Sequence, residues 1–525
     1  MDSLEYSVVI KDKRIKKTNS CFFIYGNKNH KEIIPLPDNF DLEEHKEIYP
    51  PYEYGFPVDV RFQDNKIYCF LFLISSIPAR NSDLIDDSNY TPIVIGKVAN
   101  NIKDIKLYVD YLERTGVIDI DRQYIVRQKA RGYKWANTYS SRPFISKQVV
   151  TKFADDIYKS QISTNSSEYP YLFHWYEDKL LKMNPIAELY AYFVKQQKLS
   201  DKSKEFWDWN SDLGKLKSPT VQYQAVVRNI GKIKLGEYEV HIDNNVHRLH
   251  STLTNLQKEY RNFLYYNDTQ LISVDIKNSQ PYLTCIILNP EFWNPESDMP
   301  LNIGHLPENI QKLFLDSNML TNALRAYFSE TSIANFAQYK ELVSNGSIYE
   351  YIMELANTTI RKDEEPIIDR KEAKTMMFSL LFSKDKGRSK SARIGKIKRL
   401  FNSTIFPEVG KLFKLLKADY SDLQSDKPHA RLPILLQAIE SEIILHRCCR
   451  RIWEEKEGQV PIFTIHDSIA SISEYIPFVR DVIKDELSSC VGVTPNFSIE
   501  EWEEENLDES ILHKINDHLQ NNPQG

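Results

Sequence analysis

DRKEAKTMMFSLLFS, residues 369–383, carries two cations and then two aromatic rings at every fourth position, and it contains neither Gly nor Pro. The four side chains are Arg370, Lys374, Phe378 and Phe382. This spacing predicts a helix with all four on one face. The cations suit a triphosphate and the rings suit a base or sugar. An ordinary amphipathic surface helix, basic at one end and buried at the other, is the alternative explanation.

Basic residues are concentrated around this stretch although the whole chain is acidic. The formal net charge is −6, but residues 370–399 hold eleven Lys or Arg against two acids, Glu372 and Asp385. Local charge, not the total, determines whether a surface can contact phosphates. The segment therefore predicts contact with nucleotides or nucleic acid.

Two apolar runs each end in an aspartate. Residues 271–274 lead to Asp275, and residues 460–465 lead, through one histidine, to Asp467. A single Asp at a strand end is more often a cap or turn residue. Two such carboxylates could instead hold two divalent ions about 3.5–4 Å apart for nucleotidyl transfer. Mg²⁺ fits such a site because it takes carboxylate and phosphate oxygens without a full protein cage.

A further segment precedes the first aspartate. Arg248-Leu-His-Ser-Thr-Leu-Thr-Asn-Leu-Gln257 resembles the Arg-Leu-x-Ser-x-x-x-Asn-Leu-Gln pattern of family A DNA polymerases, with His247 where that family usually has Gly. An Arg and two amide side chains around a turn can hold primer–template phosphates and minor-groove acceptors without reading sequence.

The remaining segments follow in the order of the same family. The Asp275 and Asp467 strands resemble its motifs A and C, and residues 370–382 resemble its nucleotide-binding fingers helix. Gln437, followed five residues later by Glu442, resembles a helix that packs beneath the active site in that family. The resemblance covers residues 245–500.

The resemblance implies an α+β fold shaped as a right hand with palm, fingers and thumb, and DNA-templated DNA synthesis without a proofreading exonuclease. It implies two Mg²⁺ ions as cofactors, with Mn²⁺ as an alternative, and a DNA primer–template and dNTPs as partners, with rNTPs as alternative substrates. The implied roles are catalysis by Asp275, Asp467 (the two metal ligands) and Lys374; nucleotide binding by Arg370, Lys374, Phe378, Phe382 and Gln280; and primer–template binding by Arg248, Ser251, Asn255, Gln257, Gln437 and His466.

Besides His247, two positions depart from the family pattern, and a third bears on the same choice of sugar. Gln280 stands where these DNA polymerases usually carry a Glu that excludes ribose, and Ser468 makes motif C similar to that of phage single-subunit RNA polymerases. Those RNA polymerases carry a Tyr near the end of the fingers helix, whereas this chain has Phe382, which has no hydroxyl to bond a ribose. We expect DNA synthesis with weak sugar discrimination. RNA or primer synthesis, or a polymerase-like binding protein with little turnover, are the alternatives.

Composition divides the rest of the chain. Residues 1–100 are predicted to be β-rich, with Ile67–Ser76 as strands, and residues 141–244 to form a helical thumb-like region. Residues 245–500 would hold palm and fingers, the fingers spanning about 340–420, with an insertion around Phe292–Tyr339. Residues 501–525 are expected to form an acidic tail, either a solvated helix or disordered.

Residues 101–140 resemble a winged helix. A helical period from Ile105 to Leu112 ends at Gly116, and two short strands, Val117–Ile120 and Gln123–Arg127, predict a hairpin. Duplex backbone could be gripped by four cations of the basic segment that follows, Arg127, Lys129, Arg131 and Lys134. A winged helix with a purely structural or protein-binding role fits the same pattern.

The sequence also restricts the location of the protein. No apolar run reaches transmembrane length, the N-terminus lacks a basic region followed by an apolar stretch, and the six cysteines form no Cys-x-x-Cys pair. We expect a cytoplasmic protein without a zinc ribbon or a membrane partner. A compact polymerase without proofreading would suit a phage, plasmid or other mobile element.

Overall fold

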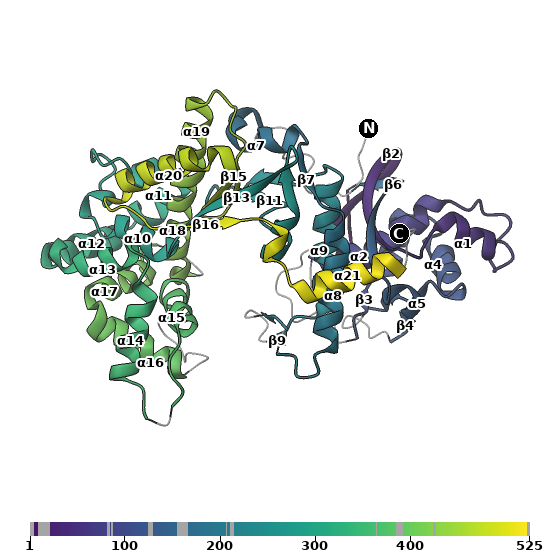
Figure 1. The fold of residues 1–525 in the computed structure, drawn as a ribbon, viewed down its shortest axis with the longest axis horizontal. Coiled ribbons are helices and arrows are strands. Elements are labelled where there is room, and N and C mark those ends of the chain that lie inside the picture. The colour runs from purple at the N-terminus through teal and green to yellow at the C-terminus, as the bar shows by residue number, and fades with distance from the viewer. Residues whose placement is uncertain are drawn as a thin grey trace.

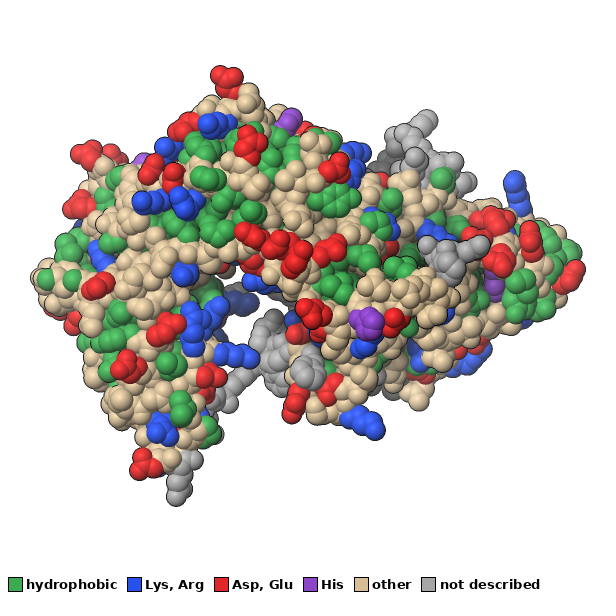
Figure 2. Space-filling view, in the orientation of Figure 1, with side chains coloured by type: hydrophobic (Ala, Val, Ile, Leu, Met, Phe, Trp, Pro, Cys, Tyr) green, Lys and Arg blue, Asp and Glu red, His purple; other side chains and the backbone are tan. Residues whose placement is uncertain are grey.

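The computed structural model describes residues 5–8, 21–80, 84–85, 88–123, 130–154, 166–205, 207–210, 215–363, 365–384, 392–423 and 427–521. The chain mixes helices and sheets, which confirms that part of the predicted fold class. Figure 1 shows the N-terminal part at the right, a central sheet, and a lobe of helices at the left. In the space-filling view an opening separates the helical lobe from the rest of the molecule (Figure 2).

The central sheet is antiparallel and is built from segments far apart in sequence. Its order is β14-β15-β13-β12-β7, and β16 pairs with β13 on the edge where β12 also pairs. Helix α20 packs against β13 and β15 and covers one face of the sheet. The elements are β7 Leu181–Met183, β12 Leu264–Tyr266, β13 Thr269–Ile276, β14 Phe463–Ile465, β15 Ser468–Ile472, β16 Phe497–Glu501 and α20 Ile476–Val491.

The helical lobe follows β13 and returns to the sheet at β14. The predicted insertion around Phe292–Tyr339 consists of short helices, with α11 and α12 as the main ones. Helix α18 continues through a π-helical stretch, Glu442–Cys449, into α19. The helices are α10 Ser279–Ile287, α11 Glu308–Leu315, α12 Asn318–Glu330, α13 Ala337–Ser344, α14 Ile348–Thr359, α15 Arg370–Phe382, α16 Ala392–Leu400, α17 Pro407–Lys417, α18 Arg431–Ser441 and α19 Arg450–Glu455.

The prediction of strands at Ile67–Ser76 is wrong, because this run lies inside helix α2, Asp64–Arg80. Nearly every side chain of the run is buried, since α4 and α9 pack against α2 along with strands β2 and β6. An apolar run buried all round has no period that separates helix from strand. The first hundred residues are therefore mixed: long β2, Cys21–Pro37, pairs with β6, Phe144–Ala154, beside helices.

The winged-helix prediction is right in its helix. Helix α4, Ile105–Arg114, is followed by Gly116, whose φ of +70° suits glycine. Strand β4, Ile118–Asp121, pairs with β5, Gly132–Trp135, while most of the predicted second strand of the hairpin, Gln123–Arg127, lies outside the described residues. Residues 124–129, including Arg127 and Lys129, lie outside the described residues. Trp135 is buried against Phe40, so the aromatic end of the segment belongs to the core.

The region 141–244 is helical only in part. Helices α7 Pro170–Glu177, α8 Ile186–Ser200 and α9 Pro219–Lys234 are present, but β6 begins the region and β7 joins the central sheet. Short apolar segments such as β7 are stabilised as strands by the neighbour with which they pair, so local sequence does not reveal them.

The predicted boundary of the acidic tail at residue 500 is wrong. It falls inside β16, which pairs with β13 over five residues, and Trp502 just beyond it is buried. The acidic composition of β16 did not predict a strand, although an edge strand tolerates charged side chains. Helix α21, Glu509–Asn521, follows the acidic segment and packs on α8 through Ile511 and Ile515. No helix among the described residues is both long and apolar enough to span a bilayer.

Candidate active site

The two predicted aspartates meet at one end of the central sheet. Asp275 is the second-last residue of β13 and pairs in register with Ser468, the first residue of β15. Asp467 directly precedes Ser468 in the tight turn from β14, where His466 adopts a φ of +56°. Antiparallel pairing therefore brings carboxylates 192 positions apart in sequence to the same corner of the sheet. Both line one cavity of about 510 Å³.

Burial and nearby negative charge raise the pKa of one aspartate at this corner of the sheet. Burial, then the nearby carboxylates of Asp467 and Glu500, raise the pKa of Asp275 to about 6, whereas Lys258 and Lys374 oppose the shift. Glu500 lies on β16, opposite Ser273 of β13, and its carboxylate is 2.9 Å from the Lys258 ammonium. Sequence reasoning missed Glu500 because it assigned this stretch to a tail.

Helix α15 forms the opposite wall of the cavity. Asp369 and Glu372 cap its start reciprocally, and Ala373, Met377 and Leu380 are among the residues that bury its inner side. The predicted face points away from this core: Arg370, Lys374 and Phe378 are exposed and line the cavity that holds the two aspartates.

The two aromatic side chains of that face differ in exposure. Phe378 stacks on Phe382 with ring centroids 5.7 Å apart and planes at 25°. Phe378 is 39% exposed and lines the cavity, whereas Phe382 is half-buried, packs against the core and is not part of the cavity wall. One ring is therefore available to a ligand and the other supports it.

Arg370 is held by neighbours on helix α14. Its Nε is 2.5 Å from a carboxylate oxygen of Glu350, and its guanidinium lies 5.2 Å from the centre of the Tyr349 ring. Both charged side chains of the pair are about half exposed. An exposed pair of this kind contributes little free energy, so a phosphate could compete for Arg370.

Gln280 sits at the wall of the cavity in an unexpected contact. Its Nε2 donates to the carboxylate of Glu440 on α18, and the other oxygen of that carboxylate accepts from Arg248. Glu440 is 3% exposed. Burial raises its pKa to about 7, against the opposing effect of Arg248. The resemblance had pointed to Glu442, which instead pairs with Arg447 at 3.1 Å.

The sequence contains a signal that would have found Glu440. It lies three residues after Gln437 in Leu-Leu-Gln-Ala-Ile-Glu-Ser, so both are on one helix face amid apolar neighbours. A charge in such a position is rarely buried unless it has a partner.

The predicted primer–template residues are arranged around a turn that follows β11, Leu249–Ser251. Ser251 is buried and its hydroxyl accepts from the amide of Thr254, so it shapes the turn. Asn255 is exposed and donates to the Ser251 carbonyl. Gln257 lines a second cavity of about 1180 Å³, which shares Ser498 with the first.

The structure thus brings six predicted residues to one cavity and leaves the others around it. The lining includes Asp275, Gln280, Arg370, Lys374, Phe378 and Asp467. Arg248 reaches its edge through Glu440, and His466 is exposed beside Asp467. Ser251, Asn255, Gln257, Phe382 and Gln437 do not line it.

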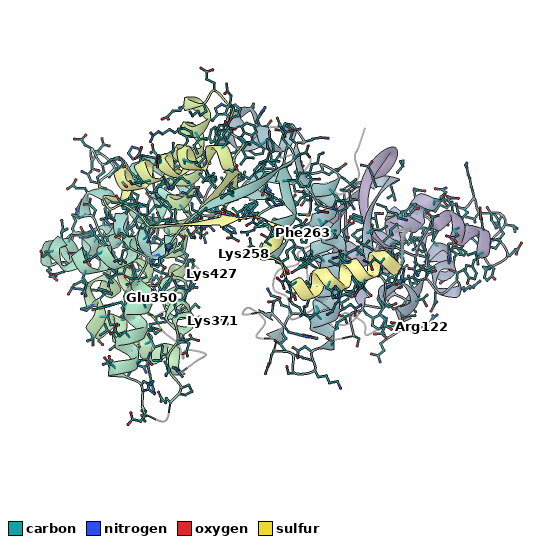
Figure 3. The ribbon with its side chains drawn as sticks, in the orientation of Figure 1. Arg122, Lys258, Phe263, Glu350, Lys371 and Lys427 are labelled. Carbon is teal, nitrogen blue, oxygen red and sulfur yellow. The ribbon has the colours of Figure 1, made fainter. Side chains whose placement is uncertain are left out.

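The margins of the opening between the lobes carry charged side chains of both signs. In Figure 2, Lys and Arg side chains gather on the helical side of the opening, and a row of Asp and Glu side chains follows its upper margin. Figure 3 shows Lys371 and Lys427 on the helical side and Lys258 at the upper margin. The helical side of the opening is therefore basic, and its upper margin carries acidic side chains together with Lys258.

Comparison with known proteins gives little further information. No protein-family model matches the chain, and no curated protein matches it in sequence. One solved structure that matches is the POL domain of Pol1 from M. smegmatis in complex with DNA primer-template and dNTP, at 11% identity and a TM-score of 0.31. The match covers 65% of this chain and 66% of that chain, just under two thirds of its length. The site is accordingly interpreted from the residues of this chain.

Proposed function

We propose that this chain catalyses template-directed nucleotidyl transfer, extending a primer on a DNA template with deoxynucleotides. One observation carries the proposal: a single cavity is lined by two carboxylates at the end of the sheet, Asp275 on β13 and Asp467 in the turn before β15, and by two helix-borne cations, Arg370 and Lys374. Nucleotidyl transfer needs this pairing, because carboxylates hold metal ions while cations bind the phosphates of the incoming nucleotide.

The donor set fits Mg²⁺ as the implied metal, with Mn²⁺ as the alternative. Among the described residues no group of three or more His, Cys, Asp or Glu could form a protein cage for a metal. Mg²⁺ does not need one, because it binds one or two carboxylates and completes its shell with water and substrate phosphates. The pKa of Asp275 is raised by burial and then by repulsion from Asp467 and Glu500, and a bound cation would relieve the repulsion. Bound Mg²⁺ ions would stabilise the attacking 3′-oxygen and the leaving pyrophosphate.

The residues of the helix wall divide the work of binding. Arg370 can bind phosphate oxygens through two parallel N–H groups once Glu350 releases it. Lys374 is close enough to Asp275 to lower its pKa, so it lies where charge develops during transfer. Phe378 offers the exposed ring on which a base or sugar can pack.

The proposed roles extend to the rest of the molecule. The central sheet would act as palm, the helices from α13 to α17 as fingers, and the region 141–244 as thumb. Arg248, Asn255 and Gln257 would contact the primer–template beside the opening, with Ser251 supporting their turn. His466 and Gln437 stay proposed contacts near its end.

DNA is the favoured product because neither ring of the aromatic pair, Phe378 in the cavity wall and Phe382 stacked on it, has a hydroxyl to bond a ribose. Gln280, in the place of a Glu, makes this preference weaker than usual. Each such interaction is worth about 1–3 kcal/mol, so one altered residue shifts sugar selectivity by roughly ten- to a hundredfold.

Primer extension tests the proposal. The chain is incubated with labelled dNTPs or rNTPs, on DNA and on RNA templates, with Mg²⁺ or Mn²⁺. We expect extension with dNTPs on DNA and slower use of rNTPs. Strong preference for rNTPs would favour RNA or primer synthesis, and binding of primer–template without extension under every condition would favour a polymerase-like binding protein.

A further inference from the structure

Two buried polar groups and the partly buried Arg248 form a chain behind the cavity wall. Arg248 precedes β11, Glu440 lies on α18 and Gln280 lies on α10, so three separate elements meet here. The Glu440 carboxylate accepts from the Arg248 guanidinium on one oxygen and from the Gln280 amide on the other. Gln280 is 8% exposed and Glu440 is 3% exposed.

We propose that Glu440 is a positioning residue, which orients the amide of Gln280 so that it offers the nucleotide cavity a hydrogen-bond acceptor, and that this sets the sugar selectivity of the site. The inference rests on the proposed function. It adds one residue, Glu440, and the direction of its effect, which is toward greater use of rNTPs. The substrate feature recognised is a hydroxyl of the nucleotide sugar.

The orientation follows from the chemistry of the two groups. An ionised carboxylate only accepts hydrogen bonds, so the half of the amide that faces Glu440 must be the NH₂ group. The opposite half is Oε1, which has no hydrogen-bond partner among the residues that the structure describes. Gln280 therefore keeps a buried acceptor without a partner, Oε1, in the wall of the cavity that it lines, while its donor group is engaged by Glu440.

A sugar hydroxyl is the ligand group that matches such an acceptor. A buried acceptor without a partner is costly, and a hydroxyl that donates to it recovers that free energy. A ribose carries one more hydroxyl than a deoxyribose, so an oriented Gln280 favours rNTPs and opposes the preference expected from Phe382. Without Glu440 the amide can rotate by 180° and turn its NH₂ group toward the sugar. The hydroxyl of a ribose then loses its hydrogen-bond acceptor.

Arg248 gives Glu440 its own support. The guanidinium counters the burial of the carboxylate and opposes the rise of its pKa. Arg248 also belongs to the segment proposed to contact the primer. Glu440 therefore links the primer side of the site to the sugar side.

The test is the ratio of kcat/KM for a dNTP to that for the matching rNTP, measured above the pKa of Glu440. For Glu440→Gln and for Gln280→Met, which keeps the volume but removes the acceptor, we expect rNTP use to fall about two- to tenfold relative to dNTP use. The double variant should change the ratio no more than either single variant. Glu442→Gln is the matched control: it lies two residues along and pairs with Arg447, so it should leave the ratio unchanged.

Breaking a buried ion pair can unfold a protein, so Glu440→Asp is measured in parallel with thermal melting. The Asp variant keeps a negative charge beside Arg248 but withdraws the carboxylate from Gln280 by the length of one methylene. It should also lower the use of rNTPs relative to dNTPs. An unchanged ratio in a folded Glu440 variant, or additive effects of the Glu440 and Gln280 variants, overturns the inference alone. A wild-type chain that adds neither dNTPs nor rNTPs overturns the proposed function, and the inference with it.

Discussion

The two walls of the cavity are built in opposite ways. The sheet wall holds Asp275 on a strand paired on both edges, where burial and nearby carboxylates raise its pKa. The helix wall presents Arg370 and Lys374 on the exposed side of α15, and Arg370 is held by a half-exposed pair with Glu350 and by the ring of Tyr349.

This difference separates groups that folding must constrain from groups that can move. Clustering acids in a partly buried site costs free energy, which the pairing and packing of the sheet must offset. Exposed cations cost little and retain freedom to follow a substrate. The comparison predicts that changes on the sheet wall affect stability and chemistry together, whereas changes on the helix wall affect substrate use alone.

The strongest test is removal of a sheet carboxylate. Asp275→Asn or Asp467→Asn should lower nucleotide addition by about a thousandfold or more, because each deletes a proposed metal ligand. Primer–template binding, measured by fluorescence anisotropy, should stay close to wild type. Wild-type extension by either variant in Mg²⁺ would remove the sheet wall from the mechanism.

The helix wall is tested by Lys374→Ala. We expect kcat/KM for the incoming nucleotide to fall about ten- to a hundredfold, since the ammonium would meet the phosphate as charge develops. Melting temperature should not change, because the side chain is exposed. Lys371→Ala is the matched control, being on the same helix and exposed but outside the cavity lining. Equal effects of the two substitutions would show that only general positive charge matters.

The free energy of unfolding, measured without metal, should depend on pH through Asp275 of the sheet wall. The pKa of Asp275 is higher in the folded chain than in the unfolded chain, so unfolding releases a proton between about pH 4 and pH 6, and this group lowers stability as pH rises through that window. Asp275→Asn should therefore raise the free energy of unfolding by about 1–3 kcal/mol above pH 6, and by little at pH 4. Urea denaturation at both pH values in EDTA measures this. If the Asn variant were less stable than wild type at neutral pH, the ionised Asp275 carboxylate would not be destabilising the folded chain, and this explanation of the sheet wall would be wrong.

The smallest effect is expected at the pair that restrains Arg370. Glu350→Gln frees the guanidinium for phosphate and should lower the KM for the nucleotide about two- to threefold with kcat unchanged. Glu354→Gln, one turn further along α14, is a suitable control because it is exposed and outside the cavity. A raised KM in the Glu350→Gln variant would mean that Glu350 helps to orient Arg370 for binding.

Local sequence was sufficient where the signal lies within one element. The period from Arg370 to Phe382 and the capping residues Asp369 and Glu372 predict α15, and the apolar runs that lead to Asp275 and Asp467 predict two strands with an acid near the end of each. Side-chain period and capping depend on neighbours a few residues away, so a single sequence contains them.

Tertiary structure alone decided the rest. Ile67–Ser76 became a helix because α4 and α9 bury it on all sides, and Phe497–Glu501 became a strand because β13 offered a free edge. Glu440 entered the site only because Arg248 and Gln280, 192 and 160 positions away, converge on its carboxylate. Burial and long-range pairing depend on residues far apart in the chain, and no local pattern records which of them will meet.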